Sequence, residues 1–168
     1  MQHTSAILTG LFGIIVLIRP LEAQDSTPPS DRPFHTDSAA SACVDRAIQA
    51  RIAEARRTFP RALQLFATGL PAGHHFSVTT RLHDRTGHFE QVFVRADSIA
   101  RDTVFGRIAS EIGFVQGFRS GQAYPVSFPN VLDWTIVRAD GTEDGNFVGK
   151  YLDSLQDRLQ AGGIPKPC

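Results

Sequence analysis

The sequence predicts an α+β domain: a small, curled antiparallel sheet of about five strands, with an amphipathic helix before it and a second helix after it. Apolar residues recur at helical spacing near the two ends of the folded part, whereas the middle alternates in the manner of strands. No helix-length segment separates these strands, so the βαβ alternation of a parallel sheet is absent. The 168-residue chain suits one domain, which we expect over residues 43–168.

The charge balance argues against one class of partner. The chain has 17 Lys and Arg residues and 17 Asp and Glu residues, so its formal net charge is zero. A protein that binds nucleic acid normally carries a basic face, because phosphate contacts dominate its affinity. We therefore expect no nucleic-acid partner.

The first segment has the pattern of an export signal. Residues 7–18 form an apolar run that is shorter than the roughly 20 residues a membrane-spanning helix needs. Such a run is typical of a secretory signal peptide, and Ala23 is a small residue at a suitable cleavage position. We expect residues 1–23 to be removed, which gives a periplasmic or secreted protein without a stable membrane anchor. The alternatives are an uncleaved anchor and a buried helix at a cytoplasmic N-terminus.

A linker and a helical region are expected next. Residues 24–42 contain three prolines among Ser, Thr and Asp, a composition that cannot bury enough apolar surface to fold, so we expect a disordered linker. Apolar residues then recur at helical spacing over residues 43–58. Pro60 lacks an N–H group and is expected to end or kink this helix, with a second short helical segment at 61–68.

Strand patterns fill the middle of the chain. Residues 76–82 and 89–94 are expected to form a hairpin, with 84–87 as a four-residue turn. A short strand over 104–108 contains Gly106, which indicates that another backbone passes close by.

The last elements are two strands and a helix. Strands are predicted over 123–128 and 133–138, with a turn around Pro129 between them. Apolar residues at helical spacing after Asn146 indicate a final helix with one face on the core. Asn146 is placed to cap its first turn.

A set of short motifs resembles one bacterial family in order and spacing. The set consists of AEARRTFPRAL at 53–63, FSV at 76–78, Glu90 with Phe93-Val94, Phe105-Gly106, Gly121 before a Val-Ser-Phe strand, Asp133-Trp134, and Gly145 before the last helix. The chain resembles domain-of-unknown-function family 2314, the YegJ-like proteins, from about residue 47 to residues 155–160. The resemblance implies these fold boundaries but no reaction. Phe93 departs from the family, which more often has Trp there, so no role for an indole N–H is implied at this position.

The predicted hairpin turn brings potential metal ligands together. With a four-residue turn, His83 lies opposite His88, and Glu90 or Asp84 can supply a third ligand for Zn²⁺ or Cu²⁺. No ligand motif of established spacing is present, however, and histidines beside an exposed turn are more often simply solvated. We therefore expect no cofactor, with a metal site as the alternative.

Glu90 and Asp133 are the candidate catalytic residues. Two carboxylates about 5–9 Å apart can divide acid and base roles in hydrolysis. The simpler interpretation is that Glu90 pairs with Arg81 across the hairpin and that Asp133 accepts backbone N–H bonds where its strand begins.

Three residues of the stretch 121–134 are candidate binding residues. Tyr124, Asp133 and Trp134, the only tryptophan of the chain, could present aromatic and acidic groups to a ligand. Aromatic residues at alternate strand positions more often belong to the core, so both interpretations stay open.

The two cysteines, Cys43 and Cys168, are expected to pair. An even number of cysteines in an exported protein indicates a disulfide, and this one would close a loop of more than 100 residues. The chain-entropy relation gives about 4–5 kcal/mol for such a loop. A redox-active pair would favour C-x-x-C spacing, which is absent, and free or intermolecular thiols are the alternative.

Two functions are compatible with these residues. The first is a non-enzymatic binding module for an unknown protein or small ligand of the cell envelope, acting through the exposed hairpin and the Asp133-Trp134 region. The second is a small metal-dependent or carboxylate-based hydrolase built on His83, His88, Glu90 and Asp133. A pocket in which those four side chains converge would favour the enzyme, whereas their dispersal over opposite faces would exclude it.

Overall fold

The computed structural model describes residues 38–161. In chain order its elements are α1 (Ser38–Ala67), β1 (His75–His83), β2 (Phe89–Ala100), β3 (Thr103–Ile108), β4 (Ala123–Ser127), a 3₁₀ turn (Phe128–Asn130), β5 (Asp133–Val137), β6 (Glu143–Gly145) and α2 (Phe147–Gln160). The prediction of an α+β domain with a helix at each end is confirmed. The short strand β6 is the one element that the sequence pattern did not indicate.

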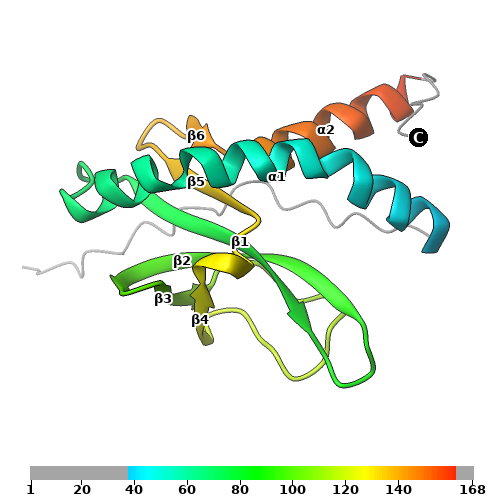
Figure 1. Cartoon of the computed structure of the whole chain (residues 1–168), viewed down its shortest axis with the longest axis horizontal. Helices are drawn as coiled ribbons and strands as arrows, with labels where there is room; N and C mark the ends of the chain where they lie inside the picture. The colour runs from blue at the N-terminus through cyan, green and yellow to red at the C-terminus, as the bar shows by residue number, and fades with distance from the viewer. Residues whose placement is uncertain (1–37, 162–168) are drawn as a thin grey trace, which may run out of the picture.

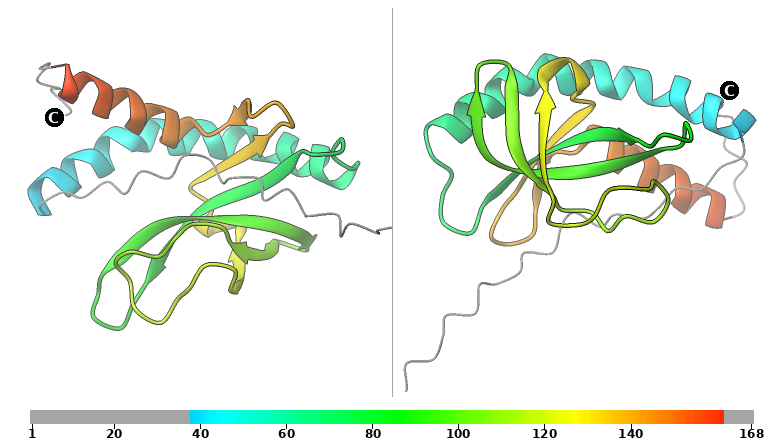
Figure 2. Two further views of the ribbon diagram at one scale, coloured as in Figure 1. Left: turned by 180° about the vertical axis from the view of Figure 1, so that it is seen from behind. Right: turned by 90° about the horizontal axis from the view of Figure 1, so that it is seen from below.

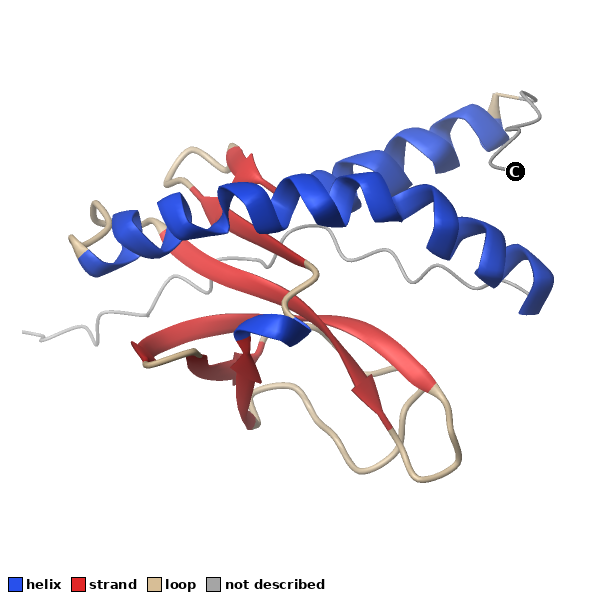
Figure 3. Cartoon of the chain, viewed as in Figure 1, coloured by secondary structure: helices blue, strands red, loops and turns tan. Residues whose placement is uncertain are grey.

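One antiparallel sheet of six strands, in the order β4-β3-β2-β1-β5-β6, organises the described part of the chain. Strands β1 to β4 are added one after another towards one edge of the sheet. The chain then crosses back, and β5 pairs with the free side of β1. Figures 1 and 3 show that the sheet is strongly curled, with β2, β3 and β4 bending away from the helices. Figure 2 shows α2 leaving the sheet beside the N-terminal half of α1.

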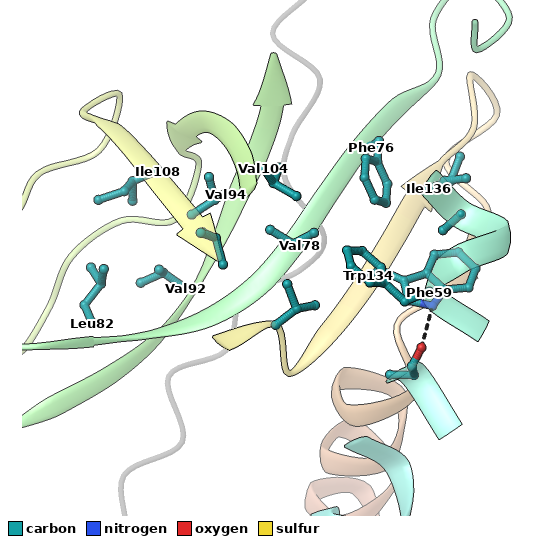
Figure 4. Close-up of a cluster of buried hydrophobic side chains, with 14 of the residues drawn as sticks. Phe59, Phe76, Val78, Leu82, Val92, Val94, Val104, Ile108, Trp134 and Ile136 are labelled. Carbon is teal, nitrogen blue, oxygen red and sulfur yellow. Dashed lines mark hydrogen bonds between the residues drawn. The ribbon is translucent and has the colours of Figure 1, made fainter. Parts of the chain in front are cut away.

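The main core lies between α1 and the inner face of the curled sheet (Figure 4). Phe59 of α1 stacks on Phe76 of β1, with ring centroids 6.5 Å apart. Trp134 of β5 packs nearby, and its indole N–H donates to the Ala55 carbonyl oxygen at 3.1 Å and to Thr58 Oγ1 at 3.0 Å. Full burial of a Phe-sized side chain stabilises a fold by roughly 1.5–3 kcal/mol, so this cluster holds α1 on the sheet.

A smaller apolar cluster joins the two helices. Ile48 and Ile52 of α1 pack against Val148 of α2, and all three side chains are buried. Because these residues lie in the N-terminal half of α1, α2 is attached to the part of α1 that extends beyond the main core.

α1 continues through Pro60, so of the two predicted effects, an end or a kink, the end does not occur, and the segment predicted at 61–68 is part of α1. Proline removes one backbone hydrogen bond, and its ring crowds the preceding turn. Pro60 itself is exposed, whereas Phe59 and Ala62 beside it are buried in the core. Their burial offsets the local cost and keeps the two predicted segments in one helix. α1 also begins at Ser38, so residues 38–42 belong to this helix and not to the predicted linker.

The β1–β2 hairpin forms as predicted, but its register differs from the prediction by one residue. His83 pairs with Phe89 and not with His88. His88 lies opposite Asp84, whose backbone N–H donates to the His88 carbonyl oxygen at 3.1 Å, while the N–H of His88 donates to Asp84 Oδ1 at 3.1 Å.

This change of register gives two charged residues new partners. Glu90 lies opposite Leu82, on the inner face, and so does not face Arg81. Arg81 instead forms an ion pair with Asp45 of α1, and its guanidinium lies 4.6 Å from the centroid of the Phe89 ring. The predicted Arg81–Glu90 pair is therefore wrong, because a slip of one residue moves a side chain to the other face.

Gly106 lies where two backbones meet, as the sequence predicts. The pairing of β2 with β3 contains a β-bulge between Ala96 and Ser98. A Cβ atom on Gly106 would lie only 2.0 Å from the carbonyl oxygen of Arg95. The curl of the sheet at this point therefore requires a residue without a side chain.

Several predictions concern parts of the chain outside this description. The signal peptide at 1–23, the linker before Ser38, and Cys168 lie outside residues 38–161, and the side chain of Cys43 is not described. The expected disulfide and the expected export signal therefore stay predictions. Neither helix of the described part combines the length and the apolar character needed to cross a membrane.

Gly106→Ala is expected to lower the unfolding free energy by about 2 kcal/mol or more, because the β2 backbone must move to admit a methyl group. Urea denaturation of the purified chain measures this change. Gly113→Ala is the matched control, since its added Cβ would meet only Glu90 Oε1, at an ordinary 3.9 Å. Equal effects of the two substitutions would contradict the close approach of β2 and β3.

Candidate functional site

The structure separates the residues of the predicted hydrolase site. Asp133 pairs with Thr79, four residues before His83 on the same strand, so these positions lie roughly 13 Å apart along β1. Glu90 pairs with Leu82 on the inner face of the sheet, whereas Asp133 is on the other face. In the described part of the chain, no three His, Cys, Asp or Glu side chains are placed to hold a metal ion. The four candidate side chains therefore do not converge on one pocket.

Asp133 is buried where β5 meets α2. Its Oδ1 accepts the N–H of Trp134 at 2.8 Å, and its Oδ2 accepts the N–H of Val148 at 2.6 Å. Burial raises the pKa of this carboxyl to about 6, because the hydrogen bonds offset only part of the lost hydration. Asp133 has no exposed surface to offer a ligand and acts instead as an acceptor for the first turn of α2.

Asn146 precedes α2 as predicted, but its side chain does not cap the helix. Its carbonyl oxygen accepts the N–H of Lys150 at 3.0 Å, which begins the helical hydrogen bonds. Its side-chain amide donates to Glu143 Oε2 at 2.7 Å, on β6. The φ of 54° at Asn146 differs from the extended backbone that is usual at a cap. The acceptor for α2 therefore comes from Asp133 in the sheet.

Trp134 and Tyr124 belong to the packed interior more than to a binding surface. Trp134 is 3% exposed, and its ring meets Phe147 edge-on with centroids 5.9 Å apart. Tyr124 is half-buried in β4, and its ring meets Phe118 edge-on at 6.0 Å. Of the two interpretations, the structure favours the core role.

Glu90 anchors the loop that precedes β4. Its carboxylate accepts three backbone N–H bonds of 2.9–3.0 Å, from Gly113, Phe114 and Val115. Consecutive N–H groups that converge on one anion form a nest, a recurrent anion-binding arrangement. Here the protein supplies its own anion, so both Glu90 oxygens are engaged in holding the loop.

Asp84 holds the same loop from the hairpin turn. Its Oδ1 accepts the N–H and the hydroxyl of Thr86, at 2.8 and 2.6 Å, as well as the N–H of His88, and its Oδ2 accepts the N–H of Gln116 at 3.3 Å. The Thr86 hydroxyl and these backbone donors lower the pKa of Asp84 to about 2, so the carboxylate is ionised near neutral pH. Figure 1 shows the β1–β2 turn and this loop side by side at one end of the sheet.

The two anchored segments present exposed rings to solvent. Phe114 is 54% exposed, and its ring centroid lies 4.8 Å from that of His88. Phe89 is 37% exposed and lies 5.9 Å from the ring of His83. These four residues, His83, His88, Phe89 and Phe114, are referred to below as the hairpin-tip surface. Exposed apolar groups with a polar rim are typical of interaction sites.

The sequence pattern singled out the two histidines of this surface but neither phenylalanine, and it missed Phe114 altogether. The sequence pattern predicts a brief helical turn that Ser110 caps and that runs through Phe114, broken by the glycines around it. That prediction is wrong, because residues 109–122 contain neither helix nor strand and the Ser110 hydroxyl accepts the N–H of Phe93 at 2.9 Å. The contact with His88 depends on hydrogen bonds to Glu90, which is 24 residues away in the chain.

Comparison of the chain with protein-family models, with curated proteins and with solved structures gave no match in any of the three. The resemblance to the YegJ-like proteins therefore stays a prediction. The function of the site is inferred from its own geometry.

Asp133→Asn is expected to remove the contribution of the Asp133 carboxyl to the unfolding free energy, and this contribution depends on pH. The pKa of this carboxyl is about 6 in the folded protein against a usual 3.8, so between these values the folded state holds a proton that the unfolded chain has lost. The contribution of Asp133 to the unfolding free energy is therefore largest below about pH 4 and falls by about 2–3 kcal/mol as the pH rises through 6. Urea denaturation at several pH values should show this fall as a difference between the parent chain and the variant.

Asp140→Asn is a control of opposite sign. The hydroxyl and N–H of Thr142 lower the pKa of Asp140, so relative to this variant the parent chain should lose stability as the pH falls. A difference between the parent chain and Asp133→Asn that does not vary with pH would contradict the raised pKa.

Glu90→Gln is expected to release the loop, because a neutral amide presents only one acceptor oxygen to the three N–H groups. The unfolding free energy should fall by about 1–3 kcal/mol, and hydrogen exchange should become faster at Gly113, Phe114 and Val115. Amide hydrogen exchange followed by NMR measures the rate at each of these residues separately. Glu111→Gln is the control, since Glu111 is an exposed residue of the same loop. Unchanged exchange in Glu90→Gln would show that the carboxylate does not hold the loop.

Proposed function

We propose that this protein is a non-enzymatic binding module that acts in the cell envelope and contacts a partner protein through the hairpin-tip surface. One observation carries the proposal: Phe114 is 54% exposed on a loop that Glu90 and Asp84 bind through four backbone N–H groups. An exposed phenylalanine reduces solubility, so its fixed presentation is best explained by contact with another molecule.

The anchoring supports binding because it reduces the entropic cost of association. A mobile loop loses conformational freedom when it binds, whereas a loop that is already held in place loses much less. The rings of Phe114 and Phe89 supply the apolar contact area, and aromatic anchors commonly provide much of the energy of an interface. His83 and His88 add polar groups at the same place, which can select among partners.

The hydrolase alternative has little support from the geometry. Glu90 is engaged by three backbone donors, and Asp133 is buried at the start of α2. His83 and His88 remain exposed, but neither carboxylate is placed to act with them as an acid or base. We therefore do not propose catalysis.

A partner protein can also bind by adding a strand to the edge of a sheet, but the two edges of this sheet are poorly suited to that mode of binding. The edge strand β4 contains Pro125, which has no N–H to donate. The opposite edge, β6, has three residues and includes the acidic side chains of Glu143 and Asp144. The hairpin tip is the more suitable contact region.

The cellular setting is part of the proposal. The apolar run at residues 7–18 supports export, and so the partner would be a protein of the periplasm or of the extracellular space. The order of short motifs supports membership of the YegJ-like family. This resemblance does not imply any enzymatic activity.

Site-specific photo-crosslinking tests the proposed surface. Benzoylphenylalanine is introduced in place of Phe114 in the full chain, which is expressed in its native cells and irradiated. We expect one or a few discrete adducts, because the side chain at this position would touch the partner directly.

Phe105 is the matched control position, since it is 43% exposed on β3, away from the hairpin turn. The adduct should be absent when benzoylphenylalanine replaces Phe105. Adducts of the same size from both positions, or from neither, would contradict a specific partner at the hairpin tip.

A further inference from the structure

A depression of about 480 Å³ opens beside the hairpin-tip surface, between the β1–β2 turn and the loop before β4. It is lined by His83, Asp84, Arg85, Thr86, Gln116, Gly117 and Phe118. Asp84 binds both walls, through Thr86 and His88 in the turn and through Gln116 in the loop, so the shape of the depression is set before any ligand arrives. Its volume lies within the range of small-ligand sites, roughly 300–1,000 Å³.

The one carboxylate in the lining has no remaining capacity to bind a ligand. An ionised carboxylate offers about four acceptor positions. Asp84 already accepts four hydrogen bonds, from the N–H and hydroxyl of Thr86 and from the N–H groups of His88 and Gln116. The Asp84 side chain is also only 2% exposed, so its oxygens are not accessible to a ligand in the depression.

The groups that remain in the lining are mainly donors. Arg85 is exposed, and no carboxylate of residues 38–161 is paired with its guanidinium. The side-chain amide of Gln116 and the ring of His83 can also donate to a ligand. Phe118 supplies an apolar wall, and its ring meets that of Tyr124 edge-on.

We infer that this depression binds a carboxylate attached to an apolar group, and specifically the C-terminal residue of a partner polypeptide. The carboxylate accepts hydrogen bonds from the Arg85 guanidinium, which matches its planar geometry, and the terminal side chain packs on Phe118. The inference rests on the binding function proposed above, because the hairpin-tip surface would contact the residues that precede the terminus.

The test uses NMR titration of the full, isotopically labelled chain with N-acetylphenylalanine, a mimic of a C-terminal residue. Its amide, N-acetylphenylalanine amide, has the same apolar body without the charge. We expect the carboxylate to bind about tenfold more tightly than the amide, with the largest shifts at the backbone amides of Gln116 and Gly117.

Arg85→Gln should reduce the affinity for the carboxylate to that for the amide. Arg61→Gln is the matched control, since it removes an equal charge from an exposed position on α1. The inference is overturned if the carboxylate and the amide bind equally, if neither binds, or if Arg61→Gln has the same effect as Arg85→Gln.

Two further ligands distinguish the source of the carboxylate. A tetrapeptide that ends in phenylalanine should bind at least as tightly as N-acetylphenylalanine and should lose this affinity when its C-terminus is amidated. Acetate should bind much more weakly, and equal binding of acetate would overturn the role of the apolar group. If these titrations fail while benzoylphenylalanine at position 114 still gives a specific adduct, the partner-binding function stands and the terminal-carboxylate site does not.

Discussion

The dipeptide Asp133-Trp134 joins the sheet to both helices, and the rest of the domain depends on this junction. The Trp134 indole N–H donates to the carbonyl oxygen of Ala55 in α1, and the Asp133 carboxylate accepts the N–H of Val148 in α2. Both bonds are buried, so loss of either partner would leave a polar group without compensation in the interior. The surrounding chain is adapted to the pair, because a Cβ on Gly145 would lie 2.2 Å from the Trp134 carbonyl oxygen.

The same physical device recurs at the hairpin tip, where carboxylates hold irregular backbone. Glu90 and Asp84 accept N–H bonds from a loop that contains neither helix nor strand and would otherwise leave these donors to water. Glu90 and Asp133, the two catalytic candidates of the sequence, and Asp84, a candidate metal ligand, thus all serve as backbone acceptors. The Glu90 carboxylate thereby holds the backbone of Phe114, whose ring contacts that of His88. This arrangement supports the partner-binding function that we propose.

Pro60 and the hairpin register show where local patterns mislead. Proline has a strong local effect, but Phe59 and Ala62 beside it are buried against the sheet, and this burial outweighs one missing hydrogen bond. At the hairpin, the turn residues predict a tight connection. The strands instead pair one residue out of the expected register, with Asp84 opposite His88, and the Asp84 side chain accepts the N–H of His88. In the helix and in the hairpin alike, the outcome depends on a contact that the local sequence pattern does not indicate.

The sequence by itself determined the α+β class, five of the six strand segments and the close approach at Gly106. It could do so because hydrophobic periodicity and the placement of glycines depend on a few neighbouring residues. It also indicated Glu90, Asp133 and the histidines as residues of interest. Only the tertiary structure decided what these residues do. A carboxylate becomes an acid, a ligand or a structural acceptor according to the groups that fold against it. For Glu90 these are the N–H groups of residues 113–115, and for Asp133 one of them is the N–H of Val148, all distant in the chain.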